Sequence, residues 1–167
     1  MDAIVSNIVT TLQSHGVSPQ IINFLIAMIP ILELRGSIII AGGILKLPLI
    51  QTYITAVLGN MLPIPFILIF IKKIFALMKQ NKYLRGFPDW CEKHAMKHSE
   101  QIEKYGYFGL YLFVAIPLPG TGAWTGSLIA TLMNLKTGKS LLAIFLGVLT
   151  AGVIISLLSF GLIQKVV

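Results

Sequence analysis

Two ionisable side chains, Glu33 and Arg35, stand two positions apart within an otherwise apolar stretch of the chain. An ionisable group at membrane depth is costly, so it predicts a functional site. The planar guanidinium of Arg35 could hold a phosphate or a carboxylate. The carboxyl group of Glu33 could carry the proton that couples transport. The alternative interpretation is a structural ion pair that fixes the turn between two helices.

A second break, at residues 117–124, combines two prolines with two glycines. Pro117 and Pro119 are expected to end the incoming helix, and Gly120 and Gly122 let the backbone turn. The next helix is expected to begin near Ala123, which would leave its free N–H groups and its positive dipole end facing the membrane centre. Such a helix start attracts anions. A plain tight turn between two helices is the alternative.

Five further residues around the breaks are candidate contacts. Pro30 is expected to break the first apolar stretch, and Gly36 to start the helix that follows. Thr121 and Thr125 could contact a substrate or bond to their own backbone, while Trp124 could line a site or pack against lipid. Two opposed helix starts, with the guanidinium between them, would form a substrate site for an anion.

No metal or cofactor is predicted. Cys91, His94 and His98 follow the spacing of one helical face, but a fourth ligand is not visible and the segment is polar, so a solvated face is favoured. The sequence also lacks a glycine-rich nucleotide loop and a nucleophile elbow. We therefore do not expect an enzyme.

The composition excludes a water-soluble domain. Of the 167 residues, 56% are hydrophobic and only 11% are charged, which leaves too little polar surface for a soluble fold. The formal net charge of +7 lies beside apolar spans and is not interleaved with aromatic residues. It therefore favours contact with membrane lipids over binding of nucleic acid.

The apolar pattern predicts an all-α integral membrane protein with two repeats. Each repeat joins a re-entrant helical hairpin to a transmembrane helix, and the hairpin arms of about 10–13 residues are roughly half as long as the hydrocarbon core is thick. Non-helical backbone at that depth requires surrounding protein or a water-filled cavity. The predicted segments are an interfacial helix at 1–16, a first repeat at 17–78 (hairpin 20–45, span 49–71), an amphipathic loop at 79–104 and a second repeat at 105–167 (hairpin 106–134, span 140–163).

A displacement of about 90 positions brings the two repeats into register. Gly36-Ser37 then falls on Gly126-Ser127, and Leu45-Lys46 falls on Leu135-Lys136. One crossing per repeat would make the two repeats inverted relative to each other.

The distribution of charge predicts the orientation in the membrane. In the hairpin arrangement, the side that holds residues 79–104 collects most of the basic residues, and the other side keeps Lys46 and Lys165. Positive charge favours the cytoplasm, so this central loop is expected to be cytoplasmic and both termini external. Four plain spans would instead move Lys136 and Lys139 across the membrane and weaken the asymmetry. The residues on the basic side are Lys72, Lys73, Lys79, Lys82, Arg85, Lys93, Lys97, Lys104, Lys136 and Lys139.

The Glu33-Leu-Arg35-Gly36 tip, the segment 117–124 and the size of the chain resemble the small multidrug export protein family. The resemblance covers the chain from about Ile21 to Gly161, and the second motif is the more distinctive. That family is distantly similar to DedA-type membrane proteins, which share paired re-entrant hairpins and are linked to lipid-carrier translocation and proton-dependent drug tolerance. The resemblance implies roles for the residues of both breaks.

Two features of the chain bear on the substrate. Unrelated small multidrug resistance proteins exchange protons for cationic drugs with an unpaired membrane glutamate, whereas Arg35 here offsets the charge of Glu33. DedA-type proteins usually carry an additional arginine motif after the second hairpin, where this chain has Lys136 and Lys139. The pairing of Arg35 with Glu33 favours an amphiphilic anion or a phosphate-bearing lipid carrier over a cationic drug, whereas the absence of the arginine motif counts against a strict lipid-phosphate mechanism.

We accordingly expect a proton-linked, multi-pass secondary transporter of the cell inner membrane, with its site between the two hairpin tips. So small a chain offers little internal surface for alternating access, so a homodimer is expected. The alternative is a non-transporting membrane organiser or assembly factor, in which the hairpins serve only as structure.

Overall fold

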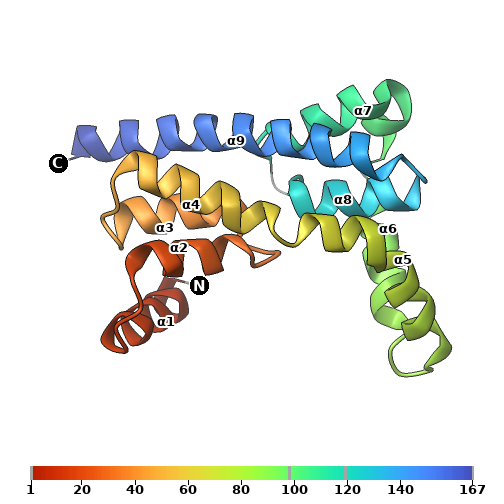
Figure 1. The fold of residues 1–167 in the computed structure, drawn as a ribbon, viewed down its shortest axis with the longest axis horizontal. Helices are drawn as coiled ribbons and strands as arrows, with labels where there is room; N and C mark the ends of the chain where they lie inside the picture. The colour runs from red at the N-terminus through yellow and green to blue at the C-terminus, as the bar shows by residue number, and fades with distance from the viewer. Residues whose placement is uncertain (1, 98, 119, 167) are drawn as a thin grey trace. The chain divides into compact units, whose positions relative to one another are not determined.

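The computed structural model describes residues 2–97, 99–118 and 120–166, and every regular element in these ranges is an α-helix. Within them, the side chains of residues 2–6, 94, 101 and 162–166 lie outside the described part. The predicted all-α class is thus confirmed. The helices labelled in Figure 1 are α1 (Asp2–Ser14), α2 (Pro19–Ala27), α3 (Glu33–Gly43), α4 (Leu49–Met61), α5 (Ile64–Gln80), α6 (Gly86–Met96), α7 (Glu100–Ala115), α8 (Ala123–Leu132) and α9 (Thr137–Val166).

Two segments are long and apolar enough to cross a membrane. They are Leu49–Gln80, which comprises α4 and α5, and Thr137–Gly161, which is most of α9. Both coincide with the predicted spans, although the first continues beyond Lys72 to Gln80. The first segment is interrupted between α4 and α5, where Pro63 and Pro65 lack the N–H groups that a continuous helix would use.

The chain divides into two compact units. Unit 1 comprises residues 1–60 and 152–167, and unit 2 comprises residues 61–151. These boundaries fall within the two long apolar segments and therefore differ from the repeats proposed at 17–78 and 105–167. The division into repeats stays a prediction.

In unit 1, α2 and α3 lie side by side as a short hairpin (Figure 1). The two arms have 9 and 11 residues, which corresponds to roughly 14–17 Å each. The hairpin buries an apolar cluster with α1, whose Val9 is fully buried against Ile22 and Ala41. The first helix is therefore held to the hairpin through its apolar face.

A polar contact in unit 1 joins α2 to α4. The side-chain amide of Asn23 donates to the Thr52 carbonyl at 3.0 Å and to the Thr55 hydroxyl at 2.7 Å. One turn further on, a methyl group added at Gly59 would lie 2.2 Å from the carbonyl oxygen of Phe24. The glycine thus lets the two helices pack with their backbones close together.

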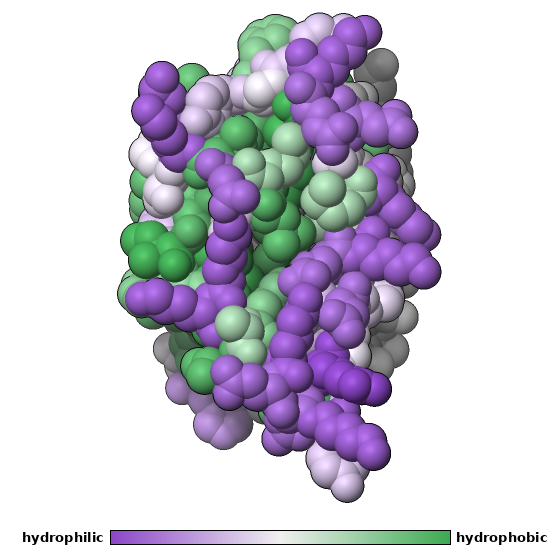
Figure 2. All heavy atoms as spheres, turned by 90° about the vertical axis from the view of Figure 1, so that its right-hand side faces the viewer, coloured by the Kyte–Doolittle hydropathy of each residue, from purple (hydrophilic) through white to green (hydrophobic). Residues whose placement is uncertain are grey.

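In unit 2, α7 and α8 form a second short hairpin. Gly106 has a non-helical backbone (φ 58°, ψ −131°) inside α7, so the straight arm before the turn covers residues 107–115. The following arm, α8, has 10 residues. Helices α5 and α6 both pack against α8, and Figure 2 shows long hydrophilic side chains around an apolar area on the face of this unit that carries α5 and α6.

The two hairpins resemble each other in local detail. Helix α3 begins at Glu33 and α8 begins at Ala123, which is 90 positions later. Ser37 and Ser127 occupy the same position in these helices, are both fully buried, and both donate to a carbonyl in the first helical turn. The register found in the sequence is therefore also the register of the helix starts.

Candidate functional site

The second hairpin turns through residues 116–122, which we call the second tip. Helix α7 ends at Ala115 and α8 begins at Ala123, where the sequence placed the helix start. Gly120 and Gly122 have φ angles of 82° and 140°, a region that residues with a Cβ atom rarely enter. Pro119 lies outside the described residues.

Thr121 holds the second tip together through its hydroxyl group. Its Oγ1 lies 2.9 Å from the Ile116 carbonyl and 2.8 Å from the Leu118 carbonyl, and it accepts a hydrogen bond from the Leu118 N–H at 3.3 Å. Of the two roles considered for Thr121, these bonds favour the one in which it satisfies its own backbone. Trp124 and Thr125 follow on α8 and are both half-buried.

The second tip lies level with the middle of α9. Tyr111 Oη is 3.2 Å from Thr150 Oγ1, and Thr150 stands next to the midpoint of the Thr137–Gly161 segment. Closer to the tip, Val114 packs on Gly147, where an added methyl group would lie 2.7 Å from Val114 Cβ. An arm that starts near the beginning of α9 therefore turns back about halfway along it.

The open end of the second hairpin is fixed by Tyr107. Its hydroxyl accepts a hydrogen bond from the Lys136 N–H at 3.0 Å, and Lys139 Nζ lies 5.7 Å from the centre of its ring. Lys72 on α5 donates to Asn134 Oδ1 in the same turn. The turn between α8 and α9 thus lies beside the middle of α5.

The first hairpin turns through residues 28–32, which we call the first tip. Pro30 is exposed within it, and α3 begins directly afterwards at Glu33. Arg35 and Gly36 therefore lie in the first turn of α3. The expectation that this helix starts at Gly36 is wrong, because α3 begins three residues earlier, directly after the apolar Ile31-Leu32 pair, and includes both charged residues.

Glu33 is buried and strained. Its side chain is 7% exposed, and its φ of 49° is unusual for a residue with a Cβ atom. Its carboxylate interacts electrostatically with the half-buried Arg35. Strain of this kind costs of order 1–3 kcal/mol and tends to occur at functional positions, so the backbone adds a second reason to regard Glu33 as a candidate site residue.

The start of α3 lies level with residue 152 of α9, within unit 1. A methyl group added at Gly152 would lie 2.7 Å from a ring carbon of Tyr53 and 3.5 Å from Leu34 Cδ1. Gly152 is close to the midpoint of the Thr137–Gly161 segment. Within unit 1, the start of α3 therefore lies beside this part of α9.

Two buried asparagines were not assigned a role at the site from the sequence. Asn23 is fully buried and Asn60 is 2% exposed. Among the atoms that the structure describes, the Oδ1 of each has no hydrogen-bond partner. The signal is present in the sequence, since both are amides within apolar helices, where a polar side chain either packs between helices or faces a functional site.

The described residues contain no group of three or more His, Cys, Asp and Glu side chains that could hold a metal ion. His98 and the His94 side chain lie outside the described part. Cys91 is buried on α6, and burial, together with the charge of Glu92, raises the pKa of its thiol.

Comparison with known proteins gives one match. The model of the family described as "Putative small multi-drug export protein" matches residues 33–154. The matched range begins at the first residue of α3 and includes the first long apolar segment and the second tip. It also includes the second long apolar segment as far as residue 154, which leaves out the last turns of α9. No curated protein and no solved structure matches the chain.

Proposed function

Because the chain belongs to the small multi-drug export protein family, we propose that this membrane protein is an exporter whose two hairpin tips contact the transported molecule. The substrate is an amphiphilic anion or a phosphate-bearing lipid carrier, and transport is coupled to protons. The family match supports export. The substrate class and the coupling are inferred from the residues at the tips.

One observation carries the proposal: the bond between Tyr111 and Thr150 holds the second hairpin against the middle of a helix that is long and apolar enough to cross a membrane. Backbone that is not helical at this depth has unsatisfied N–H and C=O groups, which lipid cannot satisfy. Interrupted helices of this kind, in matching positions of two repeats, are where secondary transporters bind their substrates. A hairpin with only a structural role would have a lower free energy if its tip lay at the membrane surface, where water satisfies the backbone groups.

The chemistry at the tips favours an anion. The first N–H groups of α8 follow Gly120 and Gly122 and carry the positive end of the helix dipole. Phosphates and carboxylates bind at helix starts of this kind, and an anion would reach this one through the exposed Gly120 side of the second tip, because Gly122 and Ala123 are buried. Arg35 adds a full positive charge in the first turn of α3, and its fork fits two oxygens of a phosphate.

Glu33 is the candidate for proton coupling. It is the acidic residue in the first turn of α3, where the helix dipole and Arg35 favour its ionised form. When an anionic substrate occupies Arg35, that stabilisation weakens and protonation of Glu33 becomes more favourable. Binding of the anion and binding of the proton would then be linked.

The re-entrant, inverted-repeat arrangement is part of the proposal. It is supported by the common register of Glu33 and Ala123 as helix starts and by the half-length arms. It is also supported by the contact of Lys72 with Asn134, since both lie on the side that the charge pattern assigns to the cytoplasm.

The test is a translocation assay with a defined probe. The full chain is reconstituted into vesicles that contain a fluorescently labelled isoprenyl phosphate, and movement between leaflets is followed by a membrane-impermeant quencher. The matched probe is the labelled isoprenyl alcohol, which lacks the phosphate. We expect the protein to accelerate movement of the phosphate but not of the alcohol, and an imposed pH gradient to change the rate.

Variants assign the effect to the first tip. Arg35→Ala is expected to reduce the rate to that of protein-free vesicles, Arg35→Lys to retain part of it, and Glu33→Gln to remove the dependence on the pH gradient. Lys46→Gln removes a positive charge away from both tips and serves as the control. Equal movement of both probes, or full activity of Arg35→Ala and Glu33→Gln, would favour the membrane-organiser alternative.

A further inference from the structure

Helix α6 packs on unit 2 through one face. Pro88, Cys91 and Ala95 follow helical spacing and are all buried, and α6 contacts both α8 and α5. These contacts fix the rotation of α6 about its axis. The remaining faces are therefore presented in a defined direction.

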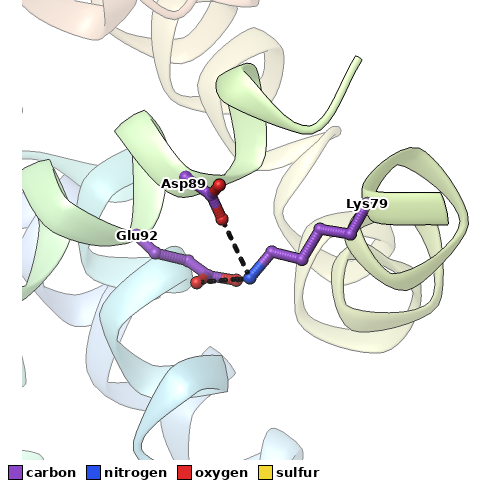
Figure 3. A network of polar contacts seen from close by, with 3 residues as sticks. All are labelled: Lys79, Asp89 and Glu92. Carbon is purple, nitrogen blue, oxygen red and sulfur yellow. Dashed lines mark hydrogen bonds and ion pairs between the residues drawn. The ribbon is translucent and has the colours of Figure 1, made fainter. Parts of the chain in front are cut away.

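A second face of α6 is acidic and is neutralised within the protein. Lys79, at the end of α5, lies 2.7 Å from a Glu92 carboxylate oxygen and 3.3 Å from Asp89 Oδ1, as Figure 3 shows. Both carboxylates belong to α6 and face the same ammonium group. Their negative charge is thus directed toward α5 and partly cancelled there.

The third face of α6, which is neither buried nor acidic, combines aromatic and basic side chains. Phe87 and Trp90 are 58% and 63% exposed, and Lys93 and Lys97 continue the same surface at helical spacing and are exposed. A water-soluble helix would rarely expose two large aromatic rings one turn apart. Aromatic rings beside lysines are the composition of helices that lie in a membrane interface.

The turn that leads into α6 extends this surface. Tyr83 is 94% exposed, and Lys82 and Arg85 are exposed on either side of it. The turn follows Gln80, where the apolar Leu49–Gln80 segment ends, so it leaves the membrane within a few residues. We name the combined surface the interfacial patch; its members are Lys82, Tyr83, Arg85, Phe87, Trp90, Lys93 and Lys97.

We propose that the interfacial patch binds the headgroups of anionic phospholipids, with Phe87 and Trp90 inserted among the acyl chains near the headgroups. Four positive charges surround the rings, and the two carboxylates of α6 face away toward Lys79. This arrangement complements a negatively charged leaflet. The inference depends on the membrane location of the chain and not on export.

The four positive charges of the interfacial patch predict a preference for anionic over zwitterionic lipids that can be measured. Each lysine or arginine near an anionic surface contributes on the order of a fivefold change in affinity, and the attraction decreases as salt is added. An aromatic surface without these charges would not distinguish between anionic and zwitterionic headgroups. The relative affinity of the patch for the two lipid classes therefore reports on the proposal directly.

The experiment uses the fluorescence of Trp90. The chain has two tryptophans, so Trp124→Phe leaves Trp90 as the single reporter in the full-length protein. The protein is reconstituted into phosphatidylcholine and phosphatidylglycerol mixtures in which one or the other lipid carries brominated chains. Bromine quenches only nearby rings, so the two quenching curves give the relative binding constant of the lipids at this position.

We expect Trp90 to be quenched, and brominated phosphatidylglycerol to quench several-fold more effectively than brominated phosphatidylcholine. Neutralising Lys82, Arg85 and Lys93 together with glutamine should bring the relative binding constant close to one. Lys46→Gln, a single charge change in unit 1, should leave it unchanged, whereas the matched Lys93→Gln should lower it. High salt should act like the triple variant.

Two outcomes would overturn the proposal, and both can be read from the chain with all its basic residues. Equal quenching by both lipids would mean that the rings enter the membrane without headgroup recognition. No quenching by either lipid would mean that the patch faces water or a partner protein. Since neither outcome involves transport, failure here leaves the proposed export function untouched.

Discussion

Tyr111 and Thr150 meet through their hydroxyl groups, 3.2 Å apart, and so attach the second hairpin to the middle of α9. Thr150 Oγ1 can also donate to the Leu146 carbonyl at 3.0 Å within its own helix, which leaves its lone pairs for the Tyr111 hydroxyl. Through this pair, the position of a local turn is defined relative to a helix that is long and apolar enough to cross a membrane. The predictions below begin from this contact.

Loss of the Tyr111–Thr150 bond should destabilise the protein modestly. Hydrogen bonds between helices in membranes are worth about 0.6 kcal/mol on average, so Tyr111→Phe should lower the midpoint of thermal unfolding in detergent by about 2 °C. Thr150→Val should have a similar effect, and the double variant should cost little more than either change alone. Tyr83→Phe, at a ring that is 94% exposed, is the control. Additive losses would show that the two hydroxyls are not coupled.

A side chain at Gly147 should displace the arm that carries the second tip. The added methyl group would lie 2.7 Å from Val114 Cβ and 3.0 Å from the Tyr111 carbonyl oxygen, so Gly147→Ala should cost about 1–3 kcal/mol. Gly161→Ala on the same helix meets nothing within 4 Å and should be neutral. Adding Val114→Ala to Gly147→Ala should recover part of the loss. Thermal unfolding that is equal for the two glycine variants would contradict this packing.

The hydroxyl of Thr121 should be needed and its methyl group should not. Thr121→Val keeps the shape but removes the contacts with the Ile116 and Leu118 carbonyls, which should cost about 1–3 kcal/mol because lipid offers these exposed groups no other partner. Thr121→Ser keeps the hydroxyl and should restore most of the stability and the translocation rate. If serine were as damaging as valine, the hydroxyl would not be what holds the second tip.

Cys91 should react slowly with maleimides at neutral pH. Burial, with a smaller contribution from Glu92, raises the pKa of its thiol, and only the thiolate reacts. Because the raised pKa lowers the thiolate fraction at neutral pH, the labelling rate should rise only at a higher pH than for an ordinary cysteine. Lys93→Cys in a Cys91→Ser background gives the exposed comparison on the same helix. Equal rates at neutral pH would contradict the burial of Cys91.

Single cysteines in the turns after the two hairpins should report the topology. Lys46 and Lys136 are exposed, so Lys46→Cys and Lys136→Cys in the Cys91→Ser background should both be accessible. An impermeant maleimide should label position 46 from outside intact cells and position 136 only after permeabilisation, while Lys72→Cys should behave like position 136 because Lys72 contacts Asn134. Labelling of 46 and 136 from the same side would exclude inverted repeats.

Several features of the fold were predictable because local chemistry determines them. Pro117 and the glycines at 120 and 122 predicted the break before α8, since a missing N–H and positive φ angles end a helix whatever surrounds it. The two long apolar segments follow from composition alone, because lipid requires about 20 consecutive apolar residues. The first tip was placed a few residues too late, since a charged pair was expected to interrupt a helix that it in fact begins.

The sequence by itself determined that this is an all-helical membrane protein, where its helices are interrupted and which residues at the breaks are charged. Only the tertiary structure decided which part of α9 each hairpin packs against: Val114 lies on Gly147 in one unit, and Leu34 lies beside Gly152 in the other. It also decided that Asp89 and Glu92 face Lys79 while Trp90 is left exposed. The rotation of a short helix is set by its neighbours, and these are distant in the sequence.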